Sequence, residues 1–428
     1  MALQRLLRNP RLLSLVGVGV SAASGFLGVM VLARTLTPGE LGIWILYLAV
    51  WTFLDMLRSG LVHTALVRFY AASQDSRYTG AAWAISGAFT ILVSTLLGGA
   101  GIVGLELSDE WRLVLPQLPW LLLATWPYSV ALWQRQAENR FDHILRLRLG
   151  FTLPFLVFIS LGFWQKWSLE SIAWVQTVLY VLVSMVAVAA GWTHWQSLRT
   201  FGKQQVRELW SFGRYTIGTL LCTNLLKSSD TFLLGYYLSS AVVAAYNLPY
   251  KLIEIVEIPL RSVMATLLPQ LSQLQYGDKQ SMTKAKALFF KELKLLTLVL
   301  VPVSMVCFIM AEPMVVLIGG EAYRDSAVLL QVFAVYSLFL PADRLIGVTL
   351  DSLGRPRFNT IKVVLMAVFN IIGDIVVLHF WADPILVAVV TIGTVVLGVV
   401  FGGVVLRNVF NSEVSVTEAE SRVLSATS

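Results

Sequence analysis

Four charged residues of one apolar stretch, Lys251, Glu254, Glu257 and Arg261, are spaced 3, 3 and 4 residues apart. This spacing keeps them on one face of an α-helix, over about 15 Å of its length. A charge facing hydrocarbon costs about 3 kcal/mol even on lenient scales, so the stripe is expected to face protein or water. The cations can hold anionic oxygen atoms through charge-assisted hydrogen bonds, while the glutamates keep them ordered. We predict a polar substrate-binding site here.

Further ionisable residues lie within apolar stretches in pairs three residues apart. Arg58 follows Asp55 and Asp230 follows Lys227, so each pair shares one helical face. We assign Arg58 and Lys227 to the substrate-binding set. Asp55, Asp230 and Asp374 are candidate coupling-ion residues, because a proton or a sodium ion could neutralise each carboxylate in turn. Asp374 has no cation one turn away, so it must find a partner elsewhere, face water or stay protonated.

A structural role is the alternative for some of these charges. Asp55–Arg58 and Asp343–Arg344 could be self-neutralising pairs that fix helix packing, whereas the four-charge stripe is too long for a single pair. The apolar stretches hold five cations and six carboxylates. This near-balance weakens the case for an anionic ligand and is compatible with transport that is coupled to a cation. The cations are Arg58, Lys227, Lys251, Arg261 and Arg344; the carboxylates are Asp55, Asp230, Glu254, Glu257, Asp343 and Asp374.

The elements that position these residues are helices long enough to cross a bilayer. The chain has 428 residues, of which 57% are hydrophobic and only 13% are charged. A crossing needs about 20 apolar residues. We expect an all-α polytopic membrane protein with twelve spans, near residues 11–33, 41–68, 80–104, 113–133, 146–164, 171–192, 212–238, 241–272, 292–318, 326–350, 359–380 and 384–407.

The distribution of basic residues predicts the orientation. Of the 32 Lys and Arg residues, 24 fall on the side of the N-terminus, the loops after even-numbered spans and the tail, counting those in the adjoining parts of the spans, and only 4 fall in the opposite loops. The positive-inside rule then places both termini in the cytoplasm, in a multi-pass protein of the inner membrane. The net charge of +7 therefore reflects orientation, and nucleic acid is not an expected partner.

The two halves of the chain resemble each other when it is shifted by 202 residues. Leu32–Trp44 then aligns with Leu234–Tyr246, with matching apolar positions, hydroxyl turns, small residues and aromatic residues. We predict an N-lobe of six spans over residues 1–200, a C-lobe of six spans over 201–410, and a cytoplasmic tail over 411–428. Six spans give both halves the same orientation, as in an alternating-access transporter with a central path.

The hairpin Leu32–Trp44, the segment Gly60–Arg68 and the polar–Asp–apolar–Gly stretch Ser229–Gly235 resemble the polysaccharide-transporter family. These are the Wzx-type flippases of O-antigen and capsule repeats, within the superfamily of multidrug/oligosaccharidyl-lipid/polysaccharide (MOP) exporters. The resemblance implies a MATE-like, V-shaped bundle of two lobes. It implies a transporter that moves a polyprenyl-pyrophosphate-linked oligosaccharide between leaflets for O-antigen, capsule or exopolysaccharide synthesis. The implied partners are that lipid-linked oligosaccharide, membrane lipids, a polysaccharide polymerase and other assembly proteins.

No enzyme is expected. The sequence has no GxSxG, Walker or HExxH motif, its four histidines have no metal-ligand spacing, and its linkers are short. We assign no catalytic residue, cofactor or metal site. The alternatives to the flippase are a cation-coupled drug or metabolite exporter of the same fold, and a non-transporting membrane scaffold in envelope synthesis.

Overall fold

The computed structural model describes residues 10–102, 115–272 and 279–426 of the chain. Helices joined by short turns make up almost all of these residues, and no strand occurs among them. The basic residues Arg5 and Arg8, and the predicted junction between the third and fourth spans, lie outside the described ranges. The prediction of an all-α polytopic membrane protein is confirmed.

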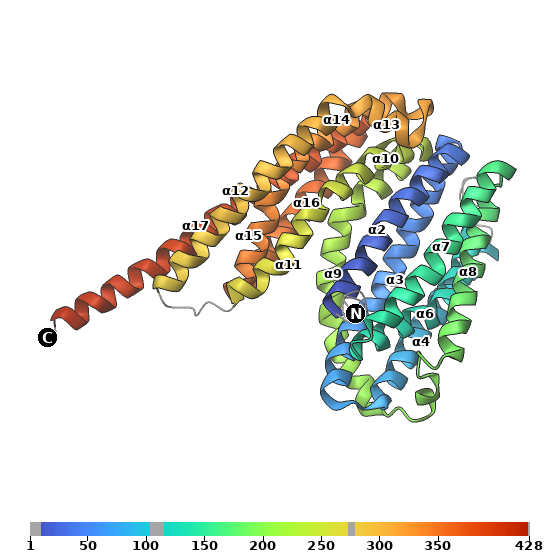
Figure 1. Ribbon diagram of the computed structural model, residues 1–428, viewed down its shortest axis with the longest axis horizontal. Helices are drawn as coiled ribbons and strands as arrows, with labels where there is room; N and C mark the ends of the chain where they lie inside the picture. The colour runs from blue at the N-terminus through green and yellow to red at the C-terminus, as the bar shows by residue number, and fades with distance from the viewer. Residues whose placement is uncertain (1–9, 103–114, 273–278, 427–428) are drawn as a thin grey trace, which may run out of the picture. The chain divides into compact units, whose positions relative to one another are not determined.

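The chain divides into two compact units, each described by itself. Unit 1 takes in the described residues of Met1–Asn224 and the short segment Ser239–Ala244. Its helices match the first six predicted spans and are drawn from blue to green in Figure 1. They are α2 Pro10–Thr35, α3 Pro38–Ser73, α4 Ser76–Ile102, α6 Leu118–Ala137, α7 Phe141–Gln165 and α8 Leu169–Ala189, with short 3₁₀ turns at Leu115–Gln117 and Trp195–Arg199.

Unit 2 takes in Leu225–Leu238 and the described residues of Ala245–Ser428. The long helix α9 (Lys203–Tyr237) contributes to both units. Three of the predicted spans are pairs of consecutive helices, because the backbone breaks within them. The helices are α10 Ser240–Val256, α11 Ile258–Ser272, α12 Lys279–Ile309, α13 Ala311–Gly319, α14 Ala327–Ser337, α15 Leu340–Ser352, α16 Pro356–Phe380 and α17 Pro384–Ala426, with a 3₁₀ turn at Glu321–Ser326.

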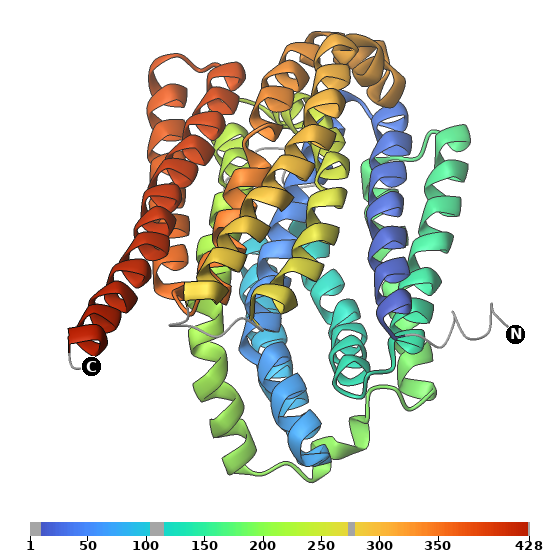
Figure 2. The ribbon, with the colours of Figure 1, turned by 60° about the vertical axis from the view of Figure 1, so that its left-hand side comes forward.

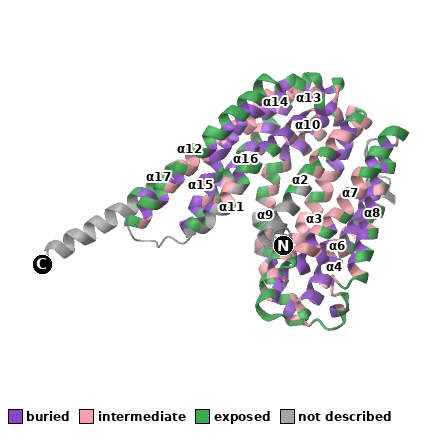
Figure 3. Cartoon of the chain, viewed as in Figure 1, coloured by how far each residue is buried: buried purple, intermediate pink, exposed green. Residues whose placement is uncertain are grey.

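Length and apolarity alone identify seven described helices that could cross a membrane, or eight if the segments Glu321–Ser337 and Leu340–Ser352, bent by 41°, form one span. The outward faces of these helices are strongly apolar. On α12, for example, Leu298 is 69% exposed and Ile309 is 67% exposed. Exposed residues run along this helix in Figure 3. Exposing this much apolar surface to water is unfavourable, so we expect these faces to contact lipid.

Local sequence explains where the first hairpin turns and why its helices fit together. Thr37 caps α3: its side chain accepts from the Glu40 backbone N–H, and Glu40 accepts from the Thr37 backbone N–H in return. Deeper in unit 1, α3 and α9 approach so closely that a Cβ atom on Gly213 would lie 2.1 Å from the Leu61 carbonyl oxygen. Only glycine permits that approach.

Glycine residues also allow α16 and α17 to pack closely in unit 2. Figure 2 shows these helices side by side in orange-red and red. A Cβ atom on Gly373 of α16 would lie 2.6 Å from a Val390 methyl group, and one on Gly398 of α17 would lie 2.4 Å from the Met366 sulfur. Small residues at a membrane helix interface allow the backbones to pack closely. Polar side chains on these two helices can therefore reach one another directly.

Candidate functional site

A group of buried polar side chains lies where α9, α10, α16 and α17 meet, and we name it the acidic cluster: Asp230, Tyr246, Asn370, Asp374, Thr391 and Thr394. Asn370 is its centre. The Asn370 amide Nδ2 donates to Asp230 Oδ1 at 2.7 Å and to Asp374 Oδ2 at 2.9 Å. Asn370 and Asp374 are one turn apart on α16, so one face of this helix presents both side chains. The amide thus bridges two carboxylates that are 144 residues apart in the sequence.

Hydroxyl groups from the neighbouring helices complete the acidic cluster. The Tyr246 hydroxyl donates to Asp230 Oδ2 at 2.5 Å, and the Thr391 hydroxyl donates to the same oxygen at 3.1 Å. Thr394, three residues further along α17, donates to Asn370 Oδ1 at 2.9 Å. Two predicted coupling residues, Asp230 and Asp374, are therefore in one site, held by side chains from all four helices.

The acidic cluster is buried, and no described basic side chain forms an ion pair with its aspartates. Asp374 is 0% exposed and Asn370 is 1% exposed. Among the described side chains, no Lys, Arg or His forms an ion pair with Asp230 or Asp374, and Asp374 Oδ1 has no hydrogen-bond partner. Two neighbouring carboxylates cannot both stay charged in a site that excludes water unless a proton or a bound cation compensates them. The free, buried Asp374 oxygen is where that charge would be held.

A second group, which we name the cationic cluster, contains Lys227, Lys251, Glu254, Glu257, Arg261 and Arg344. Each glutamate lies between two cations. Glu254 is 2.8 Å from the Lys251 ammonium and 3.6 Å from the Lys227 ammonium. Glu257 is 3.4 Å from the Arg261 guanidinium and 3.9 Å from that of Arg344.

In the cationic cluster the carboxylates are more buried than two of the cations. Its carboxylates lie inside, since Glu257 is 9% exposed and Glu254 is 25% exposed, while Lys227 and Arg261 are 60% and 56% exposed. Four cations around two carboxylates give the group a net charge of +2. The overall near-balance of charge predicted from the sequence therefore conceals a local excess of cations that a polar anionic ligand could meet.

The predicted stripe does not lie on one continuous helix. The structure ends α10 at Val256 and begins α11 at Ile258, so Glu257 sits at a break. Pro259 explains it, because proline has no backbone N–H to donate to the carbonyl one turn earlier. The stripe is therefore divided between α10 and α11, although the helical hydrogen bonds from Glu257 N–H to the Ile253 carbonyl and from Arg261 N–H to the Glu257 carbonyl continue across the break. Each of the four stripe residues forms an ion pair.

The alternative in which Asp343 and Arg344 neutralise each other is not the arrangement found. Asp343 pairs instead with Lys362 of α16, whose ammonium lies 2.7 Å from Asp343 Oδ1 and 3.0 Å from the Asp343 carbonyl oxygen. Both side chains are buried, at 3% and 8% exposure. Lys362 is thus an interior residue of unit 2, and Arg344 pairs with Glu257.

Replacing Lys362 with methionine is expected to destabilise the folded protein by about 3–5 kcal/mol, because Asp343 would be left buried without its partner. The double variant Lys362→Met with Asp343→Leu should recover most of this loss, since both charges are then removed. Membrane abundance and thermal unfolding of the purified protein measure the effect. Equal loss in the single and the double variant would contradict a role as a structural ion pair.

Unit 1 holds the remaining candidates, Asp55 and Arg58. The predicted ion pair between them is present, with Arg58 Nη2 lying 2.5 Å from Asp55 Oδ1. The Arg58 guanidinium is 0% exposed and also donates to the Leu122 carbonyl at 2.9 Å and to the Ser129 hydroxyl at 3.0 Å. Asp55 remains one-third exposed. Arg58 is thus surrounded by acceptors from its own unit, whereas Lys227, Lys251 and Arg261 expose their charged ends.

Comparison with known proteins identifies the family. The family model described as "Polysaccharide biosynthesis protein" matches residues 31–328, well over half of the chain. The chain belongs to this polysaccharide biosynthesis family. A curated relative, the probable low-salt glycan biosynthesis flippase Agl15 of Haloferax volcanii, is 20% identical over 204 residues. That match covers 46% of this chain and 43% of the relative, so the chain matches less than half of the relative's length.

Solved structures show the fold that this member of the polysaccharide biosynthesis family adopts. An inward-facing multidrug resistance MATE family transporter of the MOP superfamily matches with a TM-score of 0.73 at 11% identity, over 91% of this chain and 95% of that one. The lipid II flippase MurJ, in an inward closed conformation, matches with a TM-score of 0.73 at 13% identity, over 94% and 89%. The predicted family and MOP-type fold are confirmed. The fold is therefore the one shared by these membrane proteins.

Several residues of these two clusters were not assigned to a site from the sequence. Tyr246, Thr391 and Thr394 look like ordinary residues of apolar helices, and only the folded arrangement turns them toward Asp230 and Asn370. Asn370 was recognisable as a polar residue one turn before Asp374, but its bridging role depends on α9 lying beside α16.

Proposed function

We propose that this chain moves a polyprenyl-pyrophosphate-linked oligosaccharide across the inner membrane for surface polysaccharide synthesis, by alternating access of an N-lobe (residues 1–200) and a C-lobe (201–410). The family assignment supports a role in polysaccharide synthesis. The observation that carries the proposal lies within unit 2, where a cationic cluster of net charge +2 occurs together with a buried acidic cluster that no described basic side chain neutralises. The first suits a phosphate-bearing substrate and the second suits a driving ion.

The two clusters are joined by the helices that they share. On α9, Lys227 belongs to the cationic cluster and Asp230, one turn later, belongs to the acidic cluster. On α10, Tyr246 donates to Asp230, while Lys251 and Glu254 lie further along the same helix. An ion that shifts Asp230 and Tyr246 would therefore move the helices that carry Lys227 and Lys251. Coupling between the two clusters would therefore run through these two helices.

Within the proposal the remaining candidates have distinct roles. Lys227, Lys251 and Arg261 hold phosphate or sugar oxygens, and Glu254 and Glu257 keep these cations ordered between cycles. Asp230 and Asp374 bind the coupling ion, a proton or a sodium ion. Asp55 is a further acidic candidate in unit 1, and Arg58 holds it in place. The lipid-linked oligosaccharide, membrane lipids, a polysaccharide polymerase and other assembly proteins are the proposed partners.

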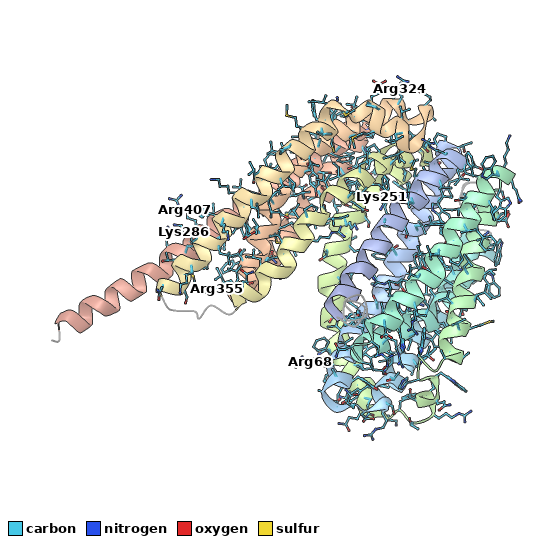
Figure 4. The ribbon with its side chains drawn as sticks, viewed as in Figure 1. Arg68, Lys251, Lys286, Arg324, Arg355 and Arg407 are labelled. Atoms are coloured by element: carbon cyan, nitrogen blue, oxygen red, sulfur yellow. The ribbon has the colours of Figure 1, made fainter. Side chains whose placement is uncertain are left out.

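The proposed orientation places both termini and the tail (411–428) in the cytoplasm. Figure 4 labels Lys286, Arg355 and Arg407 at one end of unit 2 and Arg324 at the other. A cysteine at Glu321 should therefore react with a membrane-impermeant thiol reagent added outside spheroplasts, and one at Lys284 should react only after the membrane is opened. Outside labelling at Lys284 would reverse the orientation and with it the direction of transport.

Loss of the gene tests the function in the cell. A flippase predicts that an undecorated, lipid-linked sugar intermediate accumulates in the inner leaflet and that surface polysaccharide falls. Drug hypersensitivity without such an intermediate would favour a cation-coupled exporter of the same fold. Absence of both effects would favour a non-transporting scaffold, and either of these outcomes would overturn the flippase.

A further inference from the structure

The first half of α12 carries exposed lysines and leads into an apolar stretch. The helix has 31 residues and is about 46 Å long, which exceeds the hydrocarbon thickness of about 30 Å. Its first half must therefore extend into the headgroup region or beyond. Lys284, Lys286, Lys291 and Lys294 are all exposed in that half. No carboxylate in the described part of the chain pairs with any of the four.

A shallow groove of about 480 Å³ begins where the lysines end. Phe290, Lys294, Leu298, Val301 and Pro302 contribute to its lining, together with Leu293 and Thr297. From Phe290 to Pro302 it follows about 18 Å of helix, close to the depth of about 15 Å that one leaflet's acyl chains occupy. Its walls are apolar apart from Lys294 and Thr297. Such a groove matches one extended hydrocarbon chain whose polar end lies at the lysines.

Other basic residues gather at the same end of unit 2. The Phe289 and Phe410 rings lie 6.5 Å apart and bring α17 against α12, and Arg407 lies one turn before Phe410. Figure 4 labels Lys286, Arg407 and Arg355 toward this end of unit 2. The positive charge is therefore supplied by more than one helix. A lipid with a net negative headgroup is favoured there over a zwitterionic one, by about 1 kcal/mol for each nearby cation.

We propose that this face of α12 is a binding site for an anionic phospholipid of the surrounding bilayer. The phosphate lies against Lys291 and Lys294, and one acyl chain lies along Leu298, Val301 and Pro302. The site is separate from the acidic and cationic clusters, and it does not depend on the proposed substrate. Its occupant is a bilayer lipid, because the groove lies on an outward, lipid-facing side of the helix where Leu298 is 69% exposed.

Native mass spectrometry of the purified full chain tests this, with phosphatidylglycerol and phosphatidylcholine as probes. Phosphatidylglycerol should bind more tightly. The double variant Lys291→Gln with Lys294→Gln should weaken its binding roughly thirtyfold, since two cations are lost. Leu298→Trp should also weaken it by filling the groove. The matched control, Lys203→Gln with Arg207→Gln, removes the same charge from exposed positions at the start of α9 in unit 1 and should leave binding near the wild-type value.

Three outcomes would overturn the proposal. Equal binding of the two phospholipids would remove the requirement for a negative headgroup. An equal loss in the control double variant would mean that charge acts over the whole surface rather than at a site. A polyprenyl phosphate that binds through Lys291 and Lys294 more tightly than phosphatidylglycerol would assign the groove to the carrier lipid. Unchanged thermal unfolding in each variant shows that binding, and not folding, is being measured.

Discussion

Replacement of Asp374 by asparagine is expected to lower cation-driven transport by roughly 5- to 150-fold, the usual range of a coupling free energy. Asparagine has nearly the same shape and keeps an oxygen that can accept from the Asn370 amide, so packing in the acidic cluster should persist. It removes the negative charge of the buried oxygen that has no partner. Transport in vesicles with and without an imposed proton or sodium gradient measures the effect, and shows which ion is used.

Asp325→Asn is the matched control, because this aspartate is exposed in the 3₁₀ turn after α13 and takes no part in either cluster. It should leave transport and its dependence on the gradient unchanged. Binding of the coupling ion should also raise the unfolding temperature of the wild-type protein and not that of the Asp374 variant. If the Asp374→Asn protein kept the full transport rate and its full dependence on the ion gradient, Asp374 would have a structural role and would not bind the coupling ion.

The second large effect is expected from the cationic cluster. Lys251→Ala and Arg261→Ala should each lower flipping by about tenfold or more, and together by at least about 10²-fold, since each removes a charge-assisted hydrogen bond to substrate of about 1.5–3 kcal/mol. Membrane abundance should stay near normal, because Arg261 is 56% exposed and such half-exposed pairs contribute little to stability. Flipping of lipid-linked oligosaccharide in reconstituted vesicles is the measurement.

Arg324→Ala serves as the control, because this exposed arginine pairs only with Glu312 and Glu321 among the described side chains. It should flip at the wild-type rate. A charge exchange, Glu257→Arg with Arg261→Glu, separates binding from architecture. Two results together would contradict a substrate site: the Lys251→Ala and Arg261→Ala proteins fail to accumulate in the membrane, and the charge-exchanged protein has normal abundance and activity. The cationic cluster would then be an ion-pair network that stabilises the fold.

The helices could be predicted well from the sequence because their cause is local. Long apolar runs must form helices in lipid, where every backbone polar group needs a partner within its own segment. Each predicted span therefore coincides with one helix or with two consecutive ones. Breaks such as the one at Glu257 were harder to locate. Pro249 also lies within α10 and does not interrupt it, so proline alone does not determine where a helix stops.

The site was only partly predictable, since its contacts join helices far apart in the sequence. Spacing along one helix paired Asp55 correctly with Arg58, which lie one turn apart. A pair between Asp343 and its neighbour Arg344 was one alternative from the sequence, but adjacent residues on a helix point in different directions. The actual partners, Lys362 for Asp343 and Glu257 for Arg344, come from other helices. The Asn370 bridge between Asp230 and Asp374 depends in the same way on the packing of α9 against α16.

The most direct test of the account is flipping of a polyprenyl-pyrophosphate-linked oligosaccharide by the purified chain in liposomes. The sugar that reaches the opposite leaflet is detected by a glycosidase added on that side alone. We expect translocation to accelerate under a cation gradient, to lose this acceleration in Asp374→Asn, and to cease in the Lys251→Ala, Arg261→Ala double variant. Translocation at the same rate in protein-free liposomes, or in all three proteins whatever the gradient, would contradict the proposed cation-coupled flippase.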